Sequence, residues 1–222
     1  MKNVLDHGFV ELLDSMGDDL SIVSAARISY DRDASQFPEE CNRELLEFLI
    51  KEGHTSPLEM VEFKFRIHAP VIVWWQFVRH RMAEYNARSG RYTPYLEDEF
   101  YVPKKFRRPH GTNKQASVEC DAIDHDFWHN KLVEHYTACF MLYSDMLDAG
   151  IAREIARLAL PGFALYHTFI VKMNAHSLMN FLKKRCDGHA QYEIRQYAFV
   201  MNDFFKDLCP WTYEFCKKYG RL

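Results

Sequence analysis

Four arginines, a histidine and a serine lie within residues 79–92 of this sequence. The segment opens with Arg-His-Arg at 79–81, ends with Ser-Gly-Arg at 89–91 before a tyrosine, and directly follows the largely apolar stretch 71–78. Arginines beside a hydrophobic core need an anionic partner, and planar guanidinium groups hold phosphate oxygens in pairs. A Ser-Gly pair adds a hydroxyl and an unhindered backbone N–H. The segment therefore predicts an anion-binding site, with a solvated basic turn as the alternative.

A second polar cluster, residues 174–191, has the spacing of a helix that lines a pocket. His176 and Asn180 are four residues apart and share one face of a helix, and Arg185 and His189 lie at its far end. The competing interpretation is a surface helix whose basic end is stabilised by the helix dipole.

The elements that must position these segments are helices with a few strands. Apolar and polar residues alternate over 61–68, which predicts a strand with one buried face. A helix from Pro38 to Gly53 precedes it, so residues 53–59 form a connecting loop, where binding groups often lie. Residues 82–98 are also predicted as a loop. Further helices are predicted over 19–29, 121–149, 151–160, 177–184, 190–208 and 210–219, and further strands over 100–102 and 165–173. The sum is an α+β, helix-rich chain with a small sheet, predicted as a single domain over residues 1–222.

Composition argues against several classes of protein. The chain has 222 residues and a formal net charge of −3, so it lacks the electrostatic footprint of a nucleic-acid-binding protein. Its longest apolar run is too short to span a bilayer, and its N-terminal stretch predicts no signal peptide. Six scattered cysteines without a CxxC pair indicate a reducing, cytoplasmic setting. His125 and His129 are interpreted as part of a solvated acidic face, so no metal is expected.

Taken together, the two polar segments and the connecting loop 53–59 resemble the corresponding parts of the flavin-dependent thymidylate synthases. The family signature is Arg-His-Arg, seven residues, then Ser, and it fits residues 79–89. Further segments match in the same order, and the resemblance covers nearly the whole chain, weakest across 103–130. These segments are Ala26-Arg27-Ile28-Ser29, Gly53-His54 with Pro57, Ala156-Arg157 with Pro161, Asn180-Phe181-Leu182 with Arg185, His189-Ala190-Gln191 and Cys209-Pro210-Trp211-Thr212.

The resemblance implies conversion of dUMP to dTMP. In this family methylenetetrahydrofolate supplies the carbon, and FAD reduced by NADPH supplies the hydride. The family works without a cysteine nucleophile, so Cys186 is expected to be a bystander. The resemblance also implies a mostly antiparallel sheet and a homotetramer whose active sites combine residues of several subunits.

Residue roles follow from the resemblance position by position. Arg185 is implied to be catalytic: it should face the pyrimidine and favour ionisation at N3, because a fixed cation in a dry pocket stabilises a developing anion. An ionised base is more electron-rich at C5, which can then attack the folate carbon. The implied FAD-binding residues are Ser29, His54, Ser56, Arg79, His80, Arg81, Asn174, His176, Asn180 and His189. The implied dUMP-binding residues are Gln76, Arg79, Ala87, Arg88, Ser89, Gly90, Arg91, Arg157 and Arg185.

Three positions in the implied site depart from the usual residues of the family. Glu84 replaces a serine, Ala87 replaces a glutamate and His176 replaces an arginine. If residues 84 and 87 share a helical turn, Glu84 can supply the missing carboxylate. A histidine at 176 makes FAD affinity sensitive to pH near neutrality.

These departures leave two alternatives open. A carboxylate near the base can accept a hydrogen bond from a cytosine amine, so dCMP or a hydroxymethyl product is one alternative. A non-catalytic relative that binds flavin and nucleotide is the other.

Overall fold

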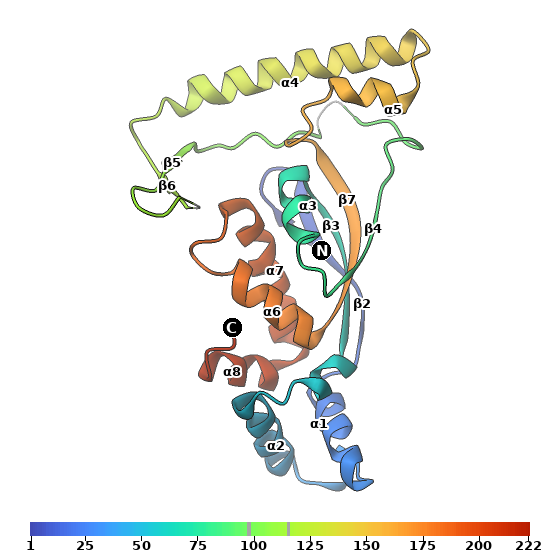
Figure 1. The fold of residues 1–222 in the computed structure, drawn as a ribbon, viewed down its shortest axis with the longest axis vertical. Helices are drawn as coiled ribbons and strands as arrows, with labels where there is room; N and C mark the ends of the chain where they lie inside the picture. Colours follow the sequence, from blue (N-terminus) through green and yellow to red (C-terminus); the bar gives the residue numbers. More distant parts are fainter. Residues whose placement is uncertain (97–98, 115) are drawn as a thin grey trace.

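The structure is a computed structural model that describes residues 1–96, 99–114 and 116–222 (Figure 1). Its centre is a five-stranded antiparallel sheet with the strand order β1-β2-β3-β7-β4. These strands are β1 (Lys2–Val4), β2 (Gly8–Met16), β3 (Glu62–Pro70), β7 (Tyr166–Asn174) and β4 (Glu84–Ala87). A separate hairpin pairs β5 (Arg107–Pro109) with β6 (Ser117–Glu119). The α+β class and the antiparallel sheet are confirmed.

Strand β3 forms because its side chains alternate between the core and the outside. Phe63, Phe65 and Ile67 are fully buried, whereas Lys64 and Arg66 between them are exposed. Fully burying one such apolar side chain stabilises the fold by about 1.5–3 kcal/mol. The predicted strand over 61–68 is therefore confirmed, and its neighbour β7 runs beside it over its whole length.

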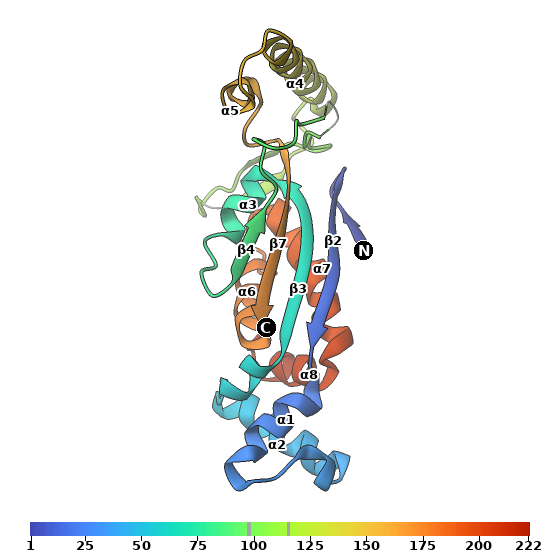
Figure 2. The same cartoon turned by 90° about the vertical axis from the view of Figure 1, so that its right-hand side faces the viewer.

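Helices cover one face of the sheet and both of its ends (Figures 1 and 2). Helices α6 and α7 pack on the sheet, and α8 joins them to α1 and α2 at one end. None of the helices in the described part of the chain combines the length and hydrophobicity needed to cross a bilayer. The α-helices are α1 (Asp19–Arg27), α2 (Glu39–Glu52), α3 (Val71–Phe77), α4 (His125–Asp148), α5 (Arg153–Ala156), α6 (Ala175–Arg185), α7 (Tyr192–Leu208) and α8 (Pro210–Lys218). Short 3-10 helices are η1 (Ile28–Tyr30), η2 (Ala34–Gln36), η3 (Ser56–Met60) and η4 (Arg157–Ala159).

At the other end of the sheet, α4 extends away from the main core (Figure 1). It packs through Phe140 and Tyr143 onto a second apolar cluster that includes Leu160 and Leu165. Much of its remaining apolar surface is exposed, including Trp128 at 51% and Met141 at 62%.

Local signals decide where two of the helices end or begin. Helix α2 ends at Gly53, whose positive φ of 77° is the left-handed cap that glycine adopts without strain. Helix α4 begins later than predicted, at His125, because the side chain of Asp124 caps it by accepting from the Phe127 N–H at 2.9 Å.

Three predictions of local structure are wrong, and two strands were not predicted. The stretch 82–98 contains a strand, β4, rather than only loop, although residues 97 and 98 lie outside the described part. The predicted strand over 100–102 is reduced to a single bridge from Phe100 to Leu165. The predicted helix over 151–160 is only the short α5 followed by η4. Strands β1 and β2 were not predicted. Strand β2 pairs with β3, more than 40 residues further along the chain, and β1 in turn pairs with β2.

Candidate active site

The Arg-His-Arg segment forms a tight turn between α3 and β4 that is anchored on α6. The imidazole of His80 lies 2.8 Å, Nε2 to Oγ, from the Ser177 hydroxyl, and the Tyr85 hydroxyl donates to the carbonyls of Phe77 and His80 at 2.6 and 3.0 Å. Burial, followed by the charge of Lys184, lowers the pKa of His80, so its ring is neutral at neutral pH. His80 therefore fixes the turn to the N-terminal half of α6.

The two arginines that flank His80 are exposed. Neither Arg79 nor Arg81 has a hydrogen bond or ion pair within the described ranges. Their guanidinium groups are available to an anion, which agrees with the anion-binding site expected in this segment.

The loop 53–57 lies beside the N-terminal half of α6. A cavity of about 150 Å³ separates them, and Asn174 caps the helix by accepting from the Ser177 N–H at 2.8 Å. His176 lies 3.4 Å from a carboxylate oxygen of Glu59, and the amide of Asn180 has no partner among the residues that the structure describes. This cavity is lined by Ile50, Gly53, Thr55, His176, Met179, Asn180, Lys183 and Arg221.

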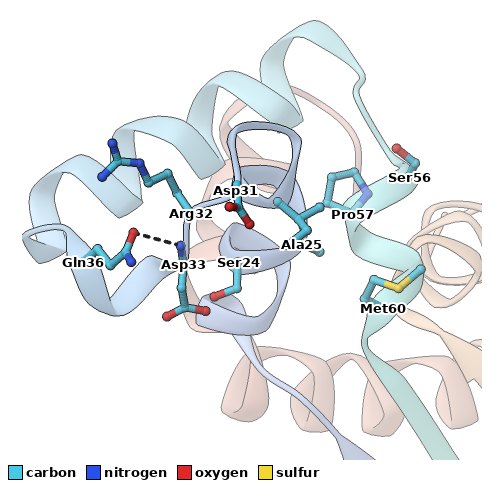
Figure 3. Close-up of a pocket in the computed structure, with 10 residues that line it drawn as sticks. Ser24, Ala25, Asp31, Arg32, Asp33, Gln36, Ser56, Pro57 and Met60 are labelled. Atoms are coloured by element: carbon cyan, nitrogen blue, oxygen red, sulfur yellow. Dashed lines mark hydrogen bonds between the residues drawn. The ribbon is translucent and has the colours of Figure 1, made fainter.

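A larger pocket of about 630 Å³ is lined in part by Ser56 and Pro57 of the same loop. Figure 3 shows Ser56 and Pro57 at one side of it, and Arg32 and Gln36 at the opposite side. Ser29 is exposed in η1 next to this pocket, but is not among the residues that line it.

Arg185 lies at the C-terminal end of α6, where it meets α3. Its guanidinium donates to the side-chain oxygen of Gln76 at 3.4 Å and to the Gln76 carbonyl at 3.3 Å. Among the described residues it has no carboxylate partner. Burial lowers the pKa of Arg185, and the nearby Tyr85 opposes this effect. The site thus holds a half-buried cation whose charge is not neutralised.

The side chains around Arg185 differ in how tightly they are held. Cys186 follows it directly, and burial raises the pKa of this thiol to about 11, so it is no thiolate at neutral pH. His189 is exposed and pairs at 2.8 Å with Asp187. Gln191, which follows, bonds to Gln76 at 2.6 Å.

A second group of implied site residues lies near α5. Arg91 pairs with Glu154 at 3.2 Å, and Arg157 donates to the Glu154 carbonyl at 3.3 Å. Gly90 is buried, and a Cβ there would lie 2.7 Å from the ring of Tyr95, so any other residue requires this ring to shift. Within the described ranges, no hydrogen bond or ion pair joins this group to Arg185 or Gln76.

Comparisons with known proteins decide the family. The family described as thymidylate synthase complementing protein matches residues 11–211. A flavin-dependent thymidylate synthase of Pseudothermotoga lettingae is 46% identical over 95% of this chain and 90% of its own length. The enzyme of the same name from a strain of Thermus thermophilus is 43% identical over 93% of this chain and 74% of its own length.

The chain belongs to the flavin-dependent thymidylate synthase family.

A solved structure agrees with this assignment. The UMP/dUMP methylase PolB of Streptomyces cacaoi, bound with 5-Br dUMP, superposes with a TM-score of 0.88 at 32% identity, covering 100% of this chain and 99% of that chain. Its complex with 5-Br UMP gives a TM-score of 0.87.

One hypothesis about the departures from the family pattern is wrong. Glu84 and Ala87 lie in strand β4, not in a helical turn, and residues three apart in a strand point to opposite faces. The Glu84 carboxylate instead lies 3.5 Å from the amine of Lys172. Glu84 therefore does not replace the carboxylate that this family usually has at position 87.

Arg88, beside these positions, is committed to the fold. It pairs with Glu99 at 3.1 Å and donates to the Pro94 carbonyl at 2.6 Å.

No group of three or more His, Cys, Asp or Glu side chains in the described part of the chain can hold a metal ion.

The sequence analysis assigned no role to Glu193 and Arg107, which connect to Gln76 through Gln191. Gln191 donates at 2.8 Å to the buried carboxylate of Glu193, which also pairs with Arg107. The only local signal was an acidic residue in the first turn of a helix, which the helix dipole explains without burial.

Proposed function

We propose that this protein converts dUMP to dTMP by reductive methylation. In the balanced reaction methylenetetrahydrofolate gives its one-carbon unit to C5, NADPH supplies a hydride, one proton is taken up, and tetrahydrofolate and NADP⁺ leave. The observation that carries the proposal is Arg185, a half-buried guanidinium without a carboxylate partner among the described residues. Such a cation is suited to negative charge that develops on a bound pyrimidine.

Arg185 acts by charge and Gln76 by position. A fixed cation near N3 stabilises the ionised base, because electrostatic interactions are stronger in a partly dehydrated site than in water. The ionised base is richer in electrons at C5, which then forms the bond to the carbon donor. Gln76 holds the guanidinium through two hydrogen bonds and lies on α3, directly before the Arg-His-Arg turn. The phosphate of dUMP is assigned to the segment 89–91 and Arg157.

The residues present fit an anionic dinucleotide such as FAD. Arg79 and Arg81 have unpaired guanidinium groups suited to a pyrophosphate, and the Asn180 amide is uncommitted among the residues that the structure describes. Ser56 lines one, and His176 the other, of the two cavities to which residues of the loop 53–57 contribute. The flavin, when bound and reduced by NADPH, supplies the hydride in this chemistry.

Assembly into a homotetramer is part of the proposal. Within one chain the Arg185 group and the segment 89–91 have no contact through hydrogen bonds or ion pairs between described residues. A second copy can bring the phosphate-binding segment of one chain to the Arg185 of another. Large exposed apolar side chains near α3, α4 and α5 support such an interface. They include Trp75 (54%), Met141 (62%), Leu158 (77%) and Phe163 (58%).

Each subunit is proposed to be one domain over residues 1–222. A reducing, cytoplasmic setting suits its six unpaired cysteines.

Mass spectrometry of the nucleotide product tests the proposed function. The purified protein is incubated anaerobically with FAD, NADPH, methylenetetrahydrofolate and equal amounts of dUMP, UMP and dCMP. We expect the mass of one methyl group on dUMP. UMP is included because the structural neighbour is a UMP/dUMP methylase. A product from dCMP alone, or a hydroxymethyl product, contradicts the proposal, and reduced flavin that is not reoxidised by folate and dUMP favours the non-catalytic alternative.

A further inference from the structure

A buried carboxylate, Glu193, receives three hydrogen bonds behind the proposed pyrimidine site. Its side chain is 4% exposed and accepts from the guanidinium of Arg107 at 2.5 Å. The Tyr101 hydroxyl donates to the same oxygen at 3.1 Å, and the Gln191 amide nitrogen donates to the other oxygen at 2.8 Å. Both oxygens of Glu193 are therefore held in place.

From Glu193 a chain of hydrogen bonds reaches Arg185. The side-chain oxygen of Gln191 accepts from the Gln76 amide nitrogen at 2.6 Å. The side-chain oxygen of Gln76 in turn accepts from Arg185 at 3.4 Å. The chain thus links α7, α3 and α6, three elements that come from distant parts of the sequence.

The hydrogen bonds from Glu193 to Arg185 can run in only one direction. A carboxylate only accepts hydrogen bonds and a guanidinium only donates them. Gln191 must therefore turn its nitrogen to Glu193 and its oxygen to Gln76, and Gln76 must turn its oxygen to Arg185. The reverse orientation would place the amide N–H groups of Gln76 against the N–H groups of Arg185. The two ends of the chain decide the orientation of both amides.

The ionised state of Glu193 maintains this direction. Burial is the largest single effect on its pKa and raises it, but the hydrogen bonds from Arg107 and Gln191 and the charge of Arg107 outweigh burial. The pKa of Glu193 consequently lies below its ordinary value, so the group stays a carboxylate at neutral pH.

We propose that Glu193 is a positioning residue for pyrimidine recognition, which acts through Gln191 and Gln76 to orient Arg185. This inference rests on the proposed function. A direct ion pair would hold Arg185 equally well but would neutralise its charge. Two neutral amides between the carboxylate and the guanidinium fix its position and leave its charge to the substrate. A cation oriented in advance needs no reorganisation during the reaction.

The test follows the ionisation of a bound nucleotide by ¹⁹F NMR. The probe is 5-fluoro-dUMP, whose N3–H the fluorine makes more acidic, titrated with pH on the FAD-loaded protein without folate. In the wild type we expect the midpoint for the bound nucleotide to lie below that for the free one. In Glu193→Gln the midpoint should rise by about one pH unit, a tenfold loss of anion stabilisation. The kcat for dUMP should fall about 10- to 100-fold with a smaller change in KM, because the phosphate contacts are not altered.

Two further variants separate orientation from simple loss of packing. Gln191→Met interrupts the hydrogen bonds between Glu193 and Arg185 but leaves the Glu193–Arg107 pair intact. It should therefore raise the midpoint as Glu193→Gln does. It also keeps the test decisive if Glu193→Gln does not fold. Tyr101→Phe removes one hydrogen bond to Glu193 outside the chain and should leave the midpoint unchanged. The midpoint in the double variant of Glu193 and Gln191 should be no higher than in the more severe single variant, since both substitutions interrupt the same series of hydrogen bonds.

The inference is overturned if the midpoint stays at the wild-type value in Gln191→Met, or if Tyr101→Phe raises it as much as Gln191→Met does. A wild-type protein that binds no 5-fluoro-dUMP would overturn the proposed function itself. That outcome is distinguishable, because it affects the wild type and not only the variants.

Discussion

Replacing Arg185 by glutamine should separate its role in catalysis from its role in stability. The two hydrogen bonds of Arg185 measure 3.3 and 3.4 Å, beyond the usual range for N–H···O bonds. Their combined net contribution to folding is about 1 kcal/mol, since even a well-formed hydrogen bond contributes only about 0.5–1.5 kcal/mol. For a chain of this size, a change of about 1 kcal/mol shifts the Tm by roughly 2–4 °C.

The expected effect on turnover is much larger. Loss of one pre-oriented donor to a developing negative charge lowers kcat by about 10²–10³, equivalent to about 3–4 kcal/mol. The assay is the rate of dTMP formation from saturating dUMP, measured by mass spectrometry beside thermal unfolding of the same preparation. Lys184→Gln is the matched control, because it removes an exposed cation from the neighbouring position.

Two results would refute this reasoning. Turnover of Arg185→Gln within about threefold of wild type would show that the cation does not stabilise the transition state. A fall in Tm of more than about 10 °C would show that Arg185 is mainly structural, since that is well beyond the shift worked out from its two hydrogen bonds.

Three further outcomes follow from the structure. Gly90→Ala should cost about 1–3 kcal/mol and weaken dUMP binding, because the new Cβ would lie 2.7 Å from a tyrosine ring; Gly162→Ala, where nothing lies within 4 Å, is the control, and equal Tm values for the two variants would contradict this. Glu84→Ala should change turnover by less than about twofold, since the exposed pair with a strand lysine is worth little, and a tenfold loss would restore a catalytic role for this carboxylate. Burial lowers the pKa of three histidines, so below about pH 6.5 the unfolded chain binds protons that the folded chain does not. The stabilisation that these neutral histidines give the folded state is complete above that pH and is lost as the pH falls toward their lower folded-state pKa values. Thermal unfolding from pH 7.5 to 5 should show a decline in Tm, and an equally steep decline in His167→Gln would argue against this explanation. These histidines are His68, His80 and His167.

Much of the fold could be predicted from the sequence, because its signals are local. The alternation in β3 and the glycine that ends α2 act within a few residues of the chain, and both are confirmed. The family could be assigned from the Arg-His-Arg signature and the segments that match with it in order. Such spacings are written in the sequence itself and need no folded structure to be visible.

Nonlocal pairing was not accessible in the same way. Strand β4 has only four residues and is held by its register with β7, from Glu84 opposite Lys172 to Ala87 opposite Phe169. Because the segment has no strong local pattern, its sequence predicts a loop and allows a helical turn. Pairing with β7 makes this segment an extended strand, and in a strand residues 84 and 87 face opposite sides.

The candidate site shows the same division. The sequence by itself determined which residue types are present: a family signature, a set of arginines for an anionic ligand, and Arg185 beyond a polar helix face. Only the tertiary structure decided which of those charges are already used. It pairs Arg88 with Glu99 and leaves the guanidinium of Arg185 without a carboxylate among the described residues. It also joins Gln76 to Gln191 across 115 positions of the chain. Hydrogen-bond direction and charge neutralisation depend on distances of a few ångströms between side chains, and folding alone sets those distances.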